Sequence, residues 1–307
     1  MIYTIGHRTT YTYEKPVGFA RCVLRLTPAT SRTQTLLASA LRITPEPVST
    51  MVGRGPFGES THTIVIDQTH TELVIEANSR VEVEPQVDQQ LFESVAWEAV
   101  RVEAFGTRDI GADGPAAFLY PTRRTPVVPA ITDYARSSFA AGRPIIAATT
   151  DLMSRMYADF RYDPETTTVS TPAAEAFEAR SGVCQDFAHI MISGLHGLGL
   201  PAAYVSGYLR TNPPPGQPRL AGADATHAWV SVWCGAASGW IGFDPTNAVL
   251  ARESHIVLAT GRDYSDVAPI DGIILSPGEQ IIKVEVDVVP DGEMVAQGGL
   301  AMTPAVH

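Results

Sequence analysis

The sequence is poor in cysteine, in basic residues and in long apolar segments, and each shortage excludes a class of protein. The three cysteines, Cys22, Cys184 and Cys234, form no C-x-x-C pair, so neither a disulfide framework nor a zinc knuckle is expected in the 307 residues. Lys and Arg total 22 against 33 Asp and Glu, a net charge of −11, and no basic cluster occurs, so we expect no nucleic-acid partner. No apolar run approaches the roughly 20 residues of a membrane span, so no membrane partner is expected either.

The beginning of the chain, MIYTIGHRTTYTYEKP, contains no apolar core of the length found in signal peptides. Together with the scarcity of cysteine, this favours the cytoplasm, where thiols stay reduced. A reducing compartment is compatible with a free thiol, whether or not that thiol has a function. Nothing in the composition indicates an oligomeric state.

The first third of the chain has the pattern of short strands. Apolar residues recur with period two in three pairs: Ile64 and Ile66, Leu73 and Ile75, and Val81 and Val83. Several short antiparallel strands with few helix signals predict a β-sandwich or small barrel over residues 1–125, and we expect the β-sandwich.

Beyond the proline-rich stretch around residues 120–134, the apolar pattern becomes helical and then returns to strands. This order predicts an α+β fold, with a core of helices and antiparallel sheet at residues 126–250. An extension at 251–295 contains the alternating segment Ile281–Val289, which we expect to pair with the N-terminal sheet. Residues 296–307 have no period and are expected to form a flexible tail.

The segment SGVCQDFAHI places a cysteine at the start of a predicted helix that runs from about Val183 to Leu198. Ser181 or Gly182 is the expected N-cap, so Cys184 lies in the first turn. Free amides at a helix N-terminus stabilise an anion, and the thiolate is the reactive form of cysteine. The alternative is a small buried core residue, since free cysteine is commonly buried.

A cysteine nucleophile needs a base, and the base needs a group that orients it. His227 and Asp244 lie on two predicted strands, HAWVSVW and GWIGFDP, which we expect to form a hairpin. The expected register sets His227 directly opposite Asp244 and leaves residues 234–237 as the loop. We expect the other histidines, including His255, to be ordinary surface or core side chains.

The stretches GVCQDFAH, GLPAAYVSGYL, HAWVSVW and GWIGFDPTN resemble the transglutaminase-like superfamily in order and in spacing. The N-terminal segment YTIGHRTTYTYEKPVGFARCVLRLTP and the closing segment GRDYSDVAPIDGIILSPGEQIIKVEVDVV resemble a bacterial group in which a β domain precedes this papain-related core. The resemblance implies that Cys184 is the nucleophile, His227 the base and Asp244 the orienting carboxylate. It implies no cofactor and no metal, and the family's second oxyanion donor lies outside the matched motifs.

The implied chemistry is acyl transfer from an amide through a thioester. We expect hydrolysis of a peptide or glutamine-type amide in a protein or peptide substrate, as in a cysteine protease or amidase. One alternative is a transglutaminase with an amine acceptor, for which Trp229, Trp233 and Trp240 could form a channel. The others are an inactive binding or scaffold protein of the same fold and a metal site built from the three candidate side chains.

Overall fold

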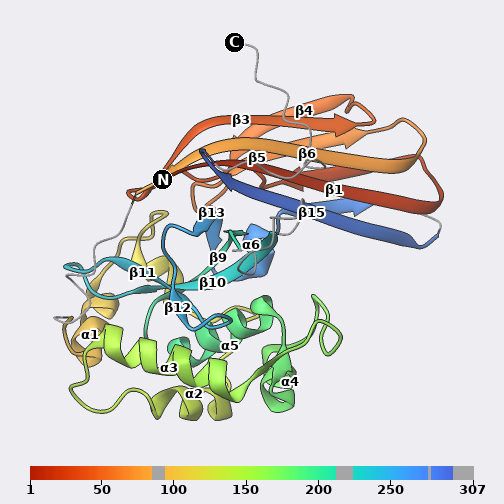
Figure 1. Cartoon of the computed structure of the whole chain (residues 1–307). Helices are drawn as coiled ribbons and strands as arrows, with labels where there is room; N and C mark the ends of the chain where they lie inside the picture. The colour runs from red at the N-terminus through yellow and green to blue at the C-terminus, as the bar shows by residue number, and fades with distance from the viewer. Residues whose placement is uncertain (85–93, 212–223, 276–277, 293–307) are drawn as a thin grey trace.

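The computed structural model describes residues 1–84, 94–211, 224–275 and 278–292. The elements stack in layers (Figure 1), with a β-sandwich on one side, a five-stranded sheet in the middle and a group of helices on the other side. This arrangement is the mixed fold of antiparallel sheets and helices that the sequence predicts. Among the described helices, none is both long and apolar enough to cross a membrane.

The β-sandwich consists of two four-stranded antiparallel sheets. One sheet has the order β15 (Gln280–Pro290), β1 (Ile2–Val17), β6 (His70–Val83) and β3 (Gln34–Thr44). The other has the order β14 (Ile270–Ile274), β2 (Ala20–Leu24), β5 (Ser60–Ile66) and β4 (Ser49–Arg54).

Alternation along the strands brings the apolar faces of these two sheets together. Ile64 and Ile66 of β5 are fully buried in the same cluster as Leu73 and Ile75 of β6. Successive side chains of a strand point to opposite faces, so residues two apart fill one core. The predicted β-sandwich is therefore confirmed, together with the period-two pattern on which it rests.

The last described strand returns to the first. Strand β15 runs antiparallel to β1, with Ile5 opposite Val288 and Thr9 opposite Val284. Strand β14 pairs in the same way with β2 of the second sheet. The expected pairing of the late alternating segment with the N-terminal sheet is confirmed.

The middle sheet has the order β12 (Val249–Leu250), β11 (Trp240–Asp244), β10 (Ala225–Trp233), β9 (Ala202–Leu209) and β13 (His255–Gly261). The described helices are α1 (Trp97–Gly106), the short 3-10 helix η2 (Pro115–Phe118), α2 (Pro129–Arg136), α3 (Ile145–Asp159), α4 (Ala173–Ala179), α5 (Cys184–Gly197) and α6 (Tyr264–Val267). A short parallel pair, β7 (Arg161–Tyr162) and β8 (Ser181–Gly182), leads into α5.

Helix α5 is the centre of the helical layer and is buried on nearly all sides. Phe187, Met191 and Leu195 share one apolar cluster with Val230 of β10 and Phe243 of β11. Full burial of a large apolar side chain contributes about 1.5–3 kcal/mol, so these contacts hold the start of α5 firmly against the middle sheet.

The opposite face of the middle sheet packs on the β-sandwich. Tyr3 and Ile5 of β1 and Val288 of β15 form one cluster with Tyr208 of β9 and Ile256 of β13. Both faces of the middle sheet are therefore covered, as its apolar strands require.

Helix α1 packs with the helical layer, because Trp97, Val100 and Ala104 belong to the same apolar cluster as α5. The limits expected at residues 125, 250 and 295 stay predictions. The expected tail at 296–307 lies outside the described residues.

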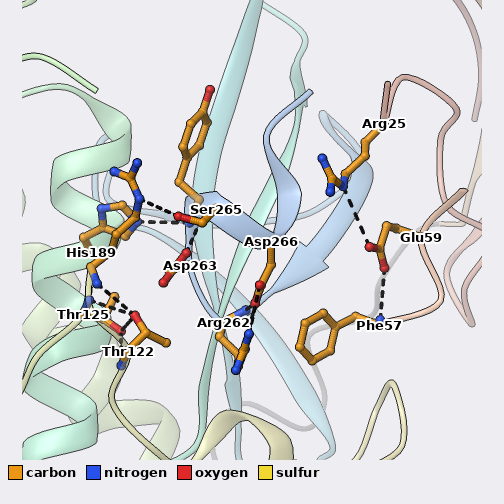
Figure 2. Close-up of polar contacts among 12 residues, drawn as sticks. Arg25, Phe57, Glu59, Thr122, Thr125, His189, Arg262, Asp263, Ser265 and Asp266 are labelled. Atoms are coloured by element: carbon orange, nitrogen blue, oxygen red, sulfur yellow. Dashed lines mark hydrogen bonds and ion pairs between the residues drawn. The ribbon is translucent and has the colours of Figure 1, made fainter. Parts of the chain in front are cut away.

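The segment around α6 is fixed to both sides of the molecule (Figure 2). The Arg262 guanidinium makes an ion pair with Asp266, with Nε and Oδ2 2.8 Å apart, and lies 5.6 Å from the centre of the Phe57 ring of the β-sandwich. On the other side, the Tyr264 amide donates a hydrogen bond of 3.2 Å to Nε2 of His189 in α5. These contacts fix the chain that follows the middle sheet.

Candidate active site

Helix α5 begins at Cys184, one residue later than its predicted start. Its N-cap is Val183, so the expectation of Ser181 or Gly182 is wrong. Val183 is extended, with φ −111° and ψ 179°, and its amide donates a hydrogen bond of 2.9 Å to Oδ2 of Asp186. The Asp186 carboxylate, at the third helical position, thus accepts a hydrogen bond from the backbone amide of the N-cap residue. With Val183 as the N-cap, Cys184 is the first residue of the helix.

Cys184 is the partly exposed cysteine of this chain, whereas Cys22 and Cys234 are buried. Burial raises the pKa of the Cys22 thiol to about 11. Burial also holds the pKa of the Cys234 thiol well above its usual range. Only Cys184 therefore combines access from solvent with the free amides of a helix N-terminus.

His227 lies on β10 and Asp244 at the end of β11, and their side chains meet. Nε2 of His227 is 2.8 Å from Oδ2 of Asp244, and both side chains are buried. Burial lowers the pKa of His227, but hydrogen bonds to Asp244 and Cys184, with the charges of both groups, raise it to about 10. The structure therefore brings together the three side chains that the sequence singles out, and the imidazolium form of His227 is favoured between the other two.

The hairpin that carries His227 and Asp244 has a register two residues away from the expected one. Trp233 pairs with Trp240 rather than with Ser238, so residues 234–239 lie beyond the last pair. Gly235 and Gly239 have φ of 93° and 66°, and the Cys234 amide donates to the Gly239 carbonyl at 2.8 Å. Two glycines in the left-handed region close a longer loop than the four residues expected.

The shift of register preserves the face on which Asp244 lies, because side chains alternate with period two. Continued by one residue, the observed pairing sets Asp244 opposite Trp229. Asp244 therefore reaches His227 along a diagonal of the ladder, a distance that long side chains span. The expected contact is present, although the expected direct opposition is wrong.

Asp244 is fully buried and accepts hydrogen bonds from several elements. Oδ2 accepts from Nε2 of His227 at 2.8 Å, from Nε2 of His255 at 3.1 Å and from Nδ2 of Asn247 at 2.7 Å. Oδ1 accepts from the backbone amides of Thr246 and Asn247. Burial alone raises a carboxyl pKa, but these hydrogen bonds and the charge of His227 hold the pKa of Asp244 well below its usual range.

The indole of Trp229 packs behind the two histidines. Its ring lies edge-on to His255 at 5.1 Å and nearly parallel to His227 at 6.1 Å between centres. A Cβ atom at Gly207 would lie 2.6 Å from this ring, and one at Gly242 would lie 3.4 Å from its Nε1. Gly207 of the neighbouring strand therefore makes room for the indole, which is only 2% exposed, whereas the distance at Gly242 is an ordinary van der Waals contact.

The remaining tryptophans of the expected channel also pack. Trp233 is buried in the apolar cluster of α5. The Nε1 atom of Trp240 donates to the carbonyl of Asp113 at 2.8 Å, and its ring lies edge-on to Phe118. Trp229 and Trp233 contribute almost no surface on which a substrate could lie.

His255 and Asn247 are the residues of this site that the sequence reasoning missed. Asn247 follows Asp244 closely, in the turn DPTN, where a short polar side chain commonly bonds to its neighbours. His255 begins the apolar strand HIVLATG. A histidine at the start of a buried strand needs a polar partner, so its position in the sequence indicates a hydrogen bond but not with which residue.

His227, Asp244 and His255 also offer three ligand atoms within 4.8 Å of one another, as a metal site would require. Metal-ligating histidines usually donate their second ring N–H to an acceptor. The Nδ1 atom of His255 instead faces a donor, the amide of Arg252, at 3.4 Å. This arrangement fits a histidine that donates to a carboxylate better than one that binds a metal ion.

Comparison with known proteins agrees with this geometry. Residues 3–82 match the bacterial transglutaminase-like N-terminal region, and residues 132–245 match the transglutaminase-like superfamily. The chain belongs to the transglutaminase-like superfamily. The second match contains Cys184, His227 and Asp244, and the first covers most of the strands of the β-sandwich.

Relatives of this superfamily member occur in bacteria. An uncharacterized protein of Mycobacterium tuberculosis is 40% identical over 297 residues, which are 94% of this chain and 92% of that protein. A protein-glutamine gamma-glutamyltransferase of Pseudomonas aeruginosa is 30% identical over 218 residues, which are 66% of this chain but 30% of that protein. The first similarity extends over both the β-sandwich and the core.

A crystal structure from Cytophaga hutchinsonii, described as that of a candidate cysteine protease, has the same fold. The TM-score is 0.72 with 21% sequence identity, over 96% of this chain and 93% of that chain. Both the β-sandwich and the core with its helix α5 are therefore parts of one shared architecture.

Proposed function

We propose that this protein is a thiol-dependent enzyme that cleaves peptide or glutamine-type amides through an acyl-enzyme. The observation that carries the proposal is the placement of His227 between Asp244, at 2.8 Å, and the Cys184 thiol at the start of α5. A nucleophile, a base and an orienting group placed in this order are the signature of this chemistry.

The proposed reaction begins when the Cys184 thiolate attacks the carbonyl carbon of the amide and its oxygen becomes an oxyanion. The backbone N–H of Cys184, at the helix N-terminus, is one donor for that oxyanion. Nε2 of His227 is engaged with Asp244, so the proton for the leaving amine comes from Nδ1. The C–N bond breaks, the amine leaves, and the acyl group remains on sulfur as a thioester.

The acyl acceptor then decides the reaction. In hydrolysis, His227 takes a proton from water, the hydroxide attacks the thioester, and the carboxylic acid leaves as the thiol is regenerated. We favour hydrolysis because Trp229 and Trp233 are buried. They do not form an apolar channel that would admit an amine and keep water away from the thioester. Amine transfer is the second candidate, and the similarity to the Pseudomonas protein-glutamine gamma-glutamyltransferase favours it.

One incubation distinguishes these activities. A glutamine-containing peptide is incubated with the enzyme, with and without a primary amine, beside reduced casein as a general protein substrate. Mass spectrometry identifies deamidation, incorporation of the amine, or cleavage of the backbone. We expect deamidation or cleavage, and the same incubation with Cys184→Ala is the matched control.

Dominant incorporation of the amine would replace hydrolysis with transglutamination. Turnover by the Cys184→Ala variant equal to that of the wild type would overturn the whole proposal. An inactive scaffold protein of the same fold would show no turnover with either substrate. A cytoplasmic location and a protein or peptide substrate, without nucleic-acid or membrane partners, complete the proposal.

A further inference from the structure

A second histidine shares the carboxylate oxygen that orients His227. Nε2 of His255 lies 3.1 Å from Oδ2 of Asp244, the same oxygen that is 2.8 Å from Nε2 of His227. His255 is 7% exposed and Asp244 is fully buried, so water does not compete for these contacts. His255 comes from β13, which lies three strands from β11 in the middle sheet.

The backbone fixes which nitrogen of His255 carries the proton. The Arg252 amide donates to Nδ1 at 3.4 Å, so Nδ1 is an acceptor in the neutral ring. The single proton of a neutral imidazole then resides on Nε2, where it is donated to Asp244. Both nitrogens of His255 are thereby engaged.

The two histidines therefore differ in what they can do. His227 has Asp244 on Nε2, and its other side is turned to the Cys184 thiol. His255 has no nitrogen left to accept a proton from a thiol or from water. We propose that His255 is a positioning residue, which holds the Asp244 carboxylate in the orientation that aligns His227 with Cys184; this inference rests on the proposed catalytic function.

The Asp244 carboxylate accepts hydrogen bonds from two parts of the chain, so its orientation is fixed from two directions. Asn247 and the amide of Thr246 belong to the turn that follows Asp244, and they would move with it. His255 is anchored outside that turn, by the pairing of β13 with β9 and by the Trp229 ring at 5.1 Å. His255 therefore ties the carboxylate to the far side of the sheet, which the local turn cannot do.

The test compares His255→Gln, whose side-chain amide can still donate to Asp244, with His255→Leu, which cannot. We expect His255→Leu to lower kcat by about ten- to hundredfold with KM little changed, the size of one hydrogen bond to a charged group. His255→Gln should keep kcat within about threefold of wild type. His62→Leu, in β5 of the β-sandwich, is the matched control and should leave kcat unchanged.

His255→Asn supplies a second comparison if the leucine variant does not fold. Its amide is as polar as that of glutamine but one methylene shorter, so it should behave like a loss of contact. Wild-type kcat in a folded leucine or asparagine variant would overturn the proposal. Equal losses in the glutamine and leucine variants would overturn it as well.

A second readout needs no substrate, so it separates a failure of this inference from a failure of the proposed function. Nitrogen-15 NMR of protein labelled at histidine should show His255 as the Nε2–H tautomer at neutral pH. The Nε2–H signal of His227 should move in His255→Leu, return in His255→Gln and stay in place in His62→Leu. A proton on Nδ1 of His255, or an unmoved His227 signal in His255→Leu, would refute the shared carboxylate.

Discussion

The three thiols should react with iodoacetamide at very different rates, and the difference follows from burial and from His227. Cys22, whose pKa burial raises to about 11, is ionised to only about one part in 10⁵ at pH 6. An ordinary exposed thiol with a pKa of about 8.5 is ionised to roughly 0.3% at that pH. The difference in ionised fraction alone therefore predicts about 300-fold faster alkylation of an exposed thiol than of Cys22.

The ion pair with His227 adds a second signature, which is the shape of the pH dependence. Alkylation of an ordinary thiol speeds up about tenfold for each pH unit, hence about 300-fold between pH 5.5 and pH 8. The pKa of His227 is raised to about 10, so the imidazolium, a positive charge beside the Cys184 sulfur, persists through that range. We expect the rate at Cys184 to change less than about threefold over the same interval.

The assay is alkylation at a series of pH values, followed by digestion and mass spectrometry of the three cysteine peptides. The His227→Gln variant is the control, since its amide can still bond to Asp244 but cannot carry a proton to balance a thiolate. Its Cys184 should recover the tenfold dependence on each pH unit. A wild-type rate that rises tenfold per unit, as in this variant, would refute the thiolate–imidazolium pair.

Three further predictions address the same site. Cys184→Ala should abolish turnover and leave the melting temperature within a few degrees, because Cys184 is only partly buried and the change removes one small atom. Calorimetry that shows an unfolded variant would favour a structural role for the cysteine. Asp244→Ala should cost about 3–5 kcal/mol in urea unfolding, because two buried histidines lose their partner, whereas Asp133→Ala, at a side chain that is 79% exposed, should change little. The stabilisation from the Asp244–His227 pair should be fully present between the unfolded pKa values of about 4 for Asp and 6.5 for His. It should be lost as pH falls through the lowered pKa of Asp244, and it should fade as pH rises through about 10, the raised pKa of His227. A stability difference between wild type and Asp244→Ala that stays constant from pH 5 to pH 10.5 would contradict this sign.

The parts of the fold that local periodicity controls could be predicted from the sequence. Strands of the β-sandwich follow from alternation, and α5 follows from its apolar face and the glycines at its end. The contact of His227 with Asp244 could be predicted because it requires only that both side chains lie on the same face of the hairpin. A register shift of two residues leaves each side chain on its face.

The remaining features depend on contacts that local patterns do not contain. The length of the loop after Trp233 depends on the left-handed conformations of Gly235 and Gly239. The N-cap at Val183 depends on the Asp186 carboxylate, which turns back to the Val183 amide. The contact of His255 with Asp244 depends on the order of strands in the middle sheet, where β13 lies at the far edge from β12.

The return of β14 and β15 to the first two strands makes the transglutaminase-like core an insertion within a β-sandwich. Six strands of the sandwich precede the core in the chain, and the two that border β1 and β2 follow it. During synthesis the sandwich therefore cannot close until the ribosome has passed Cys184, His227 and Asp244. Both ends of the core are therefore joined to one closed β-sandwich, whereas a domain in a tandem array is joined to its neighbour by a single linker.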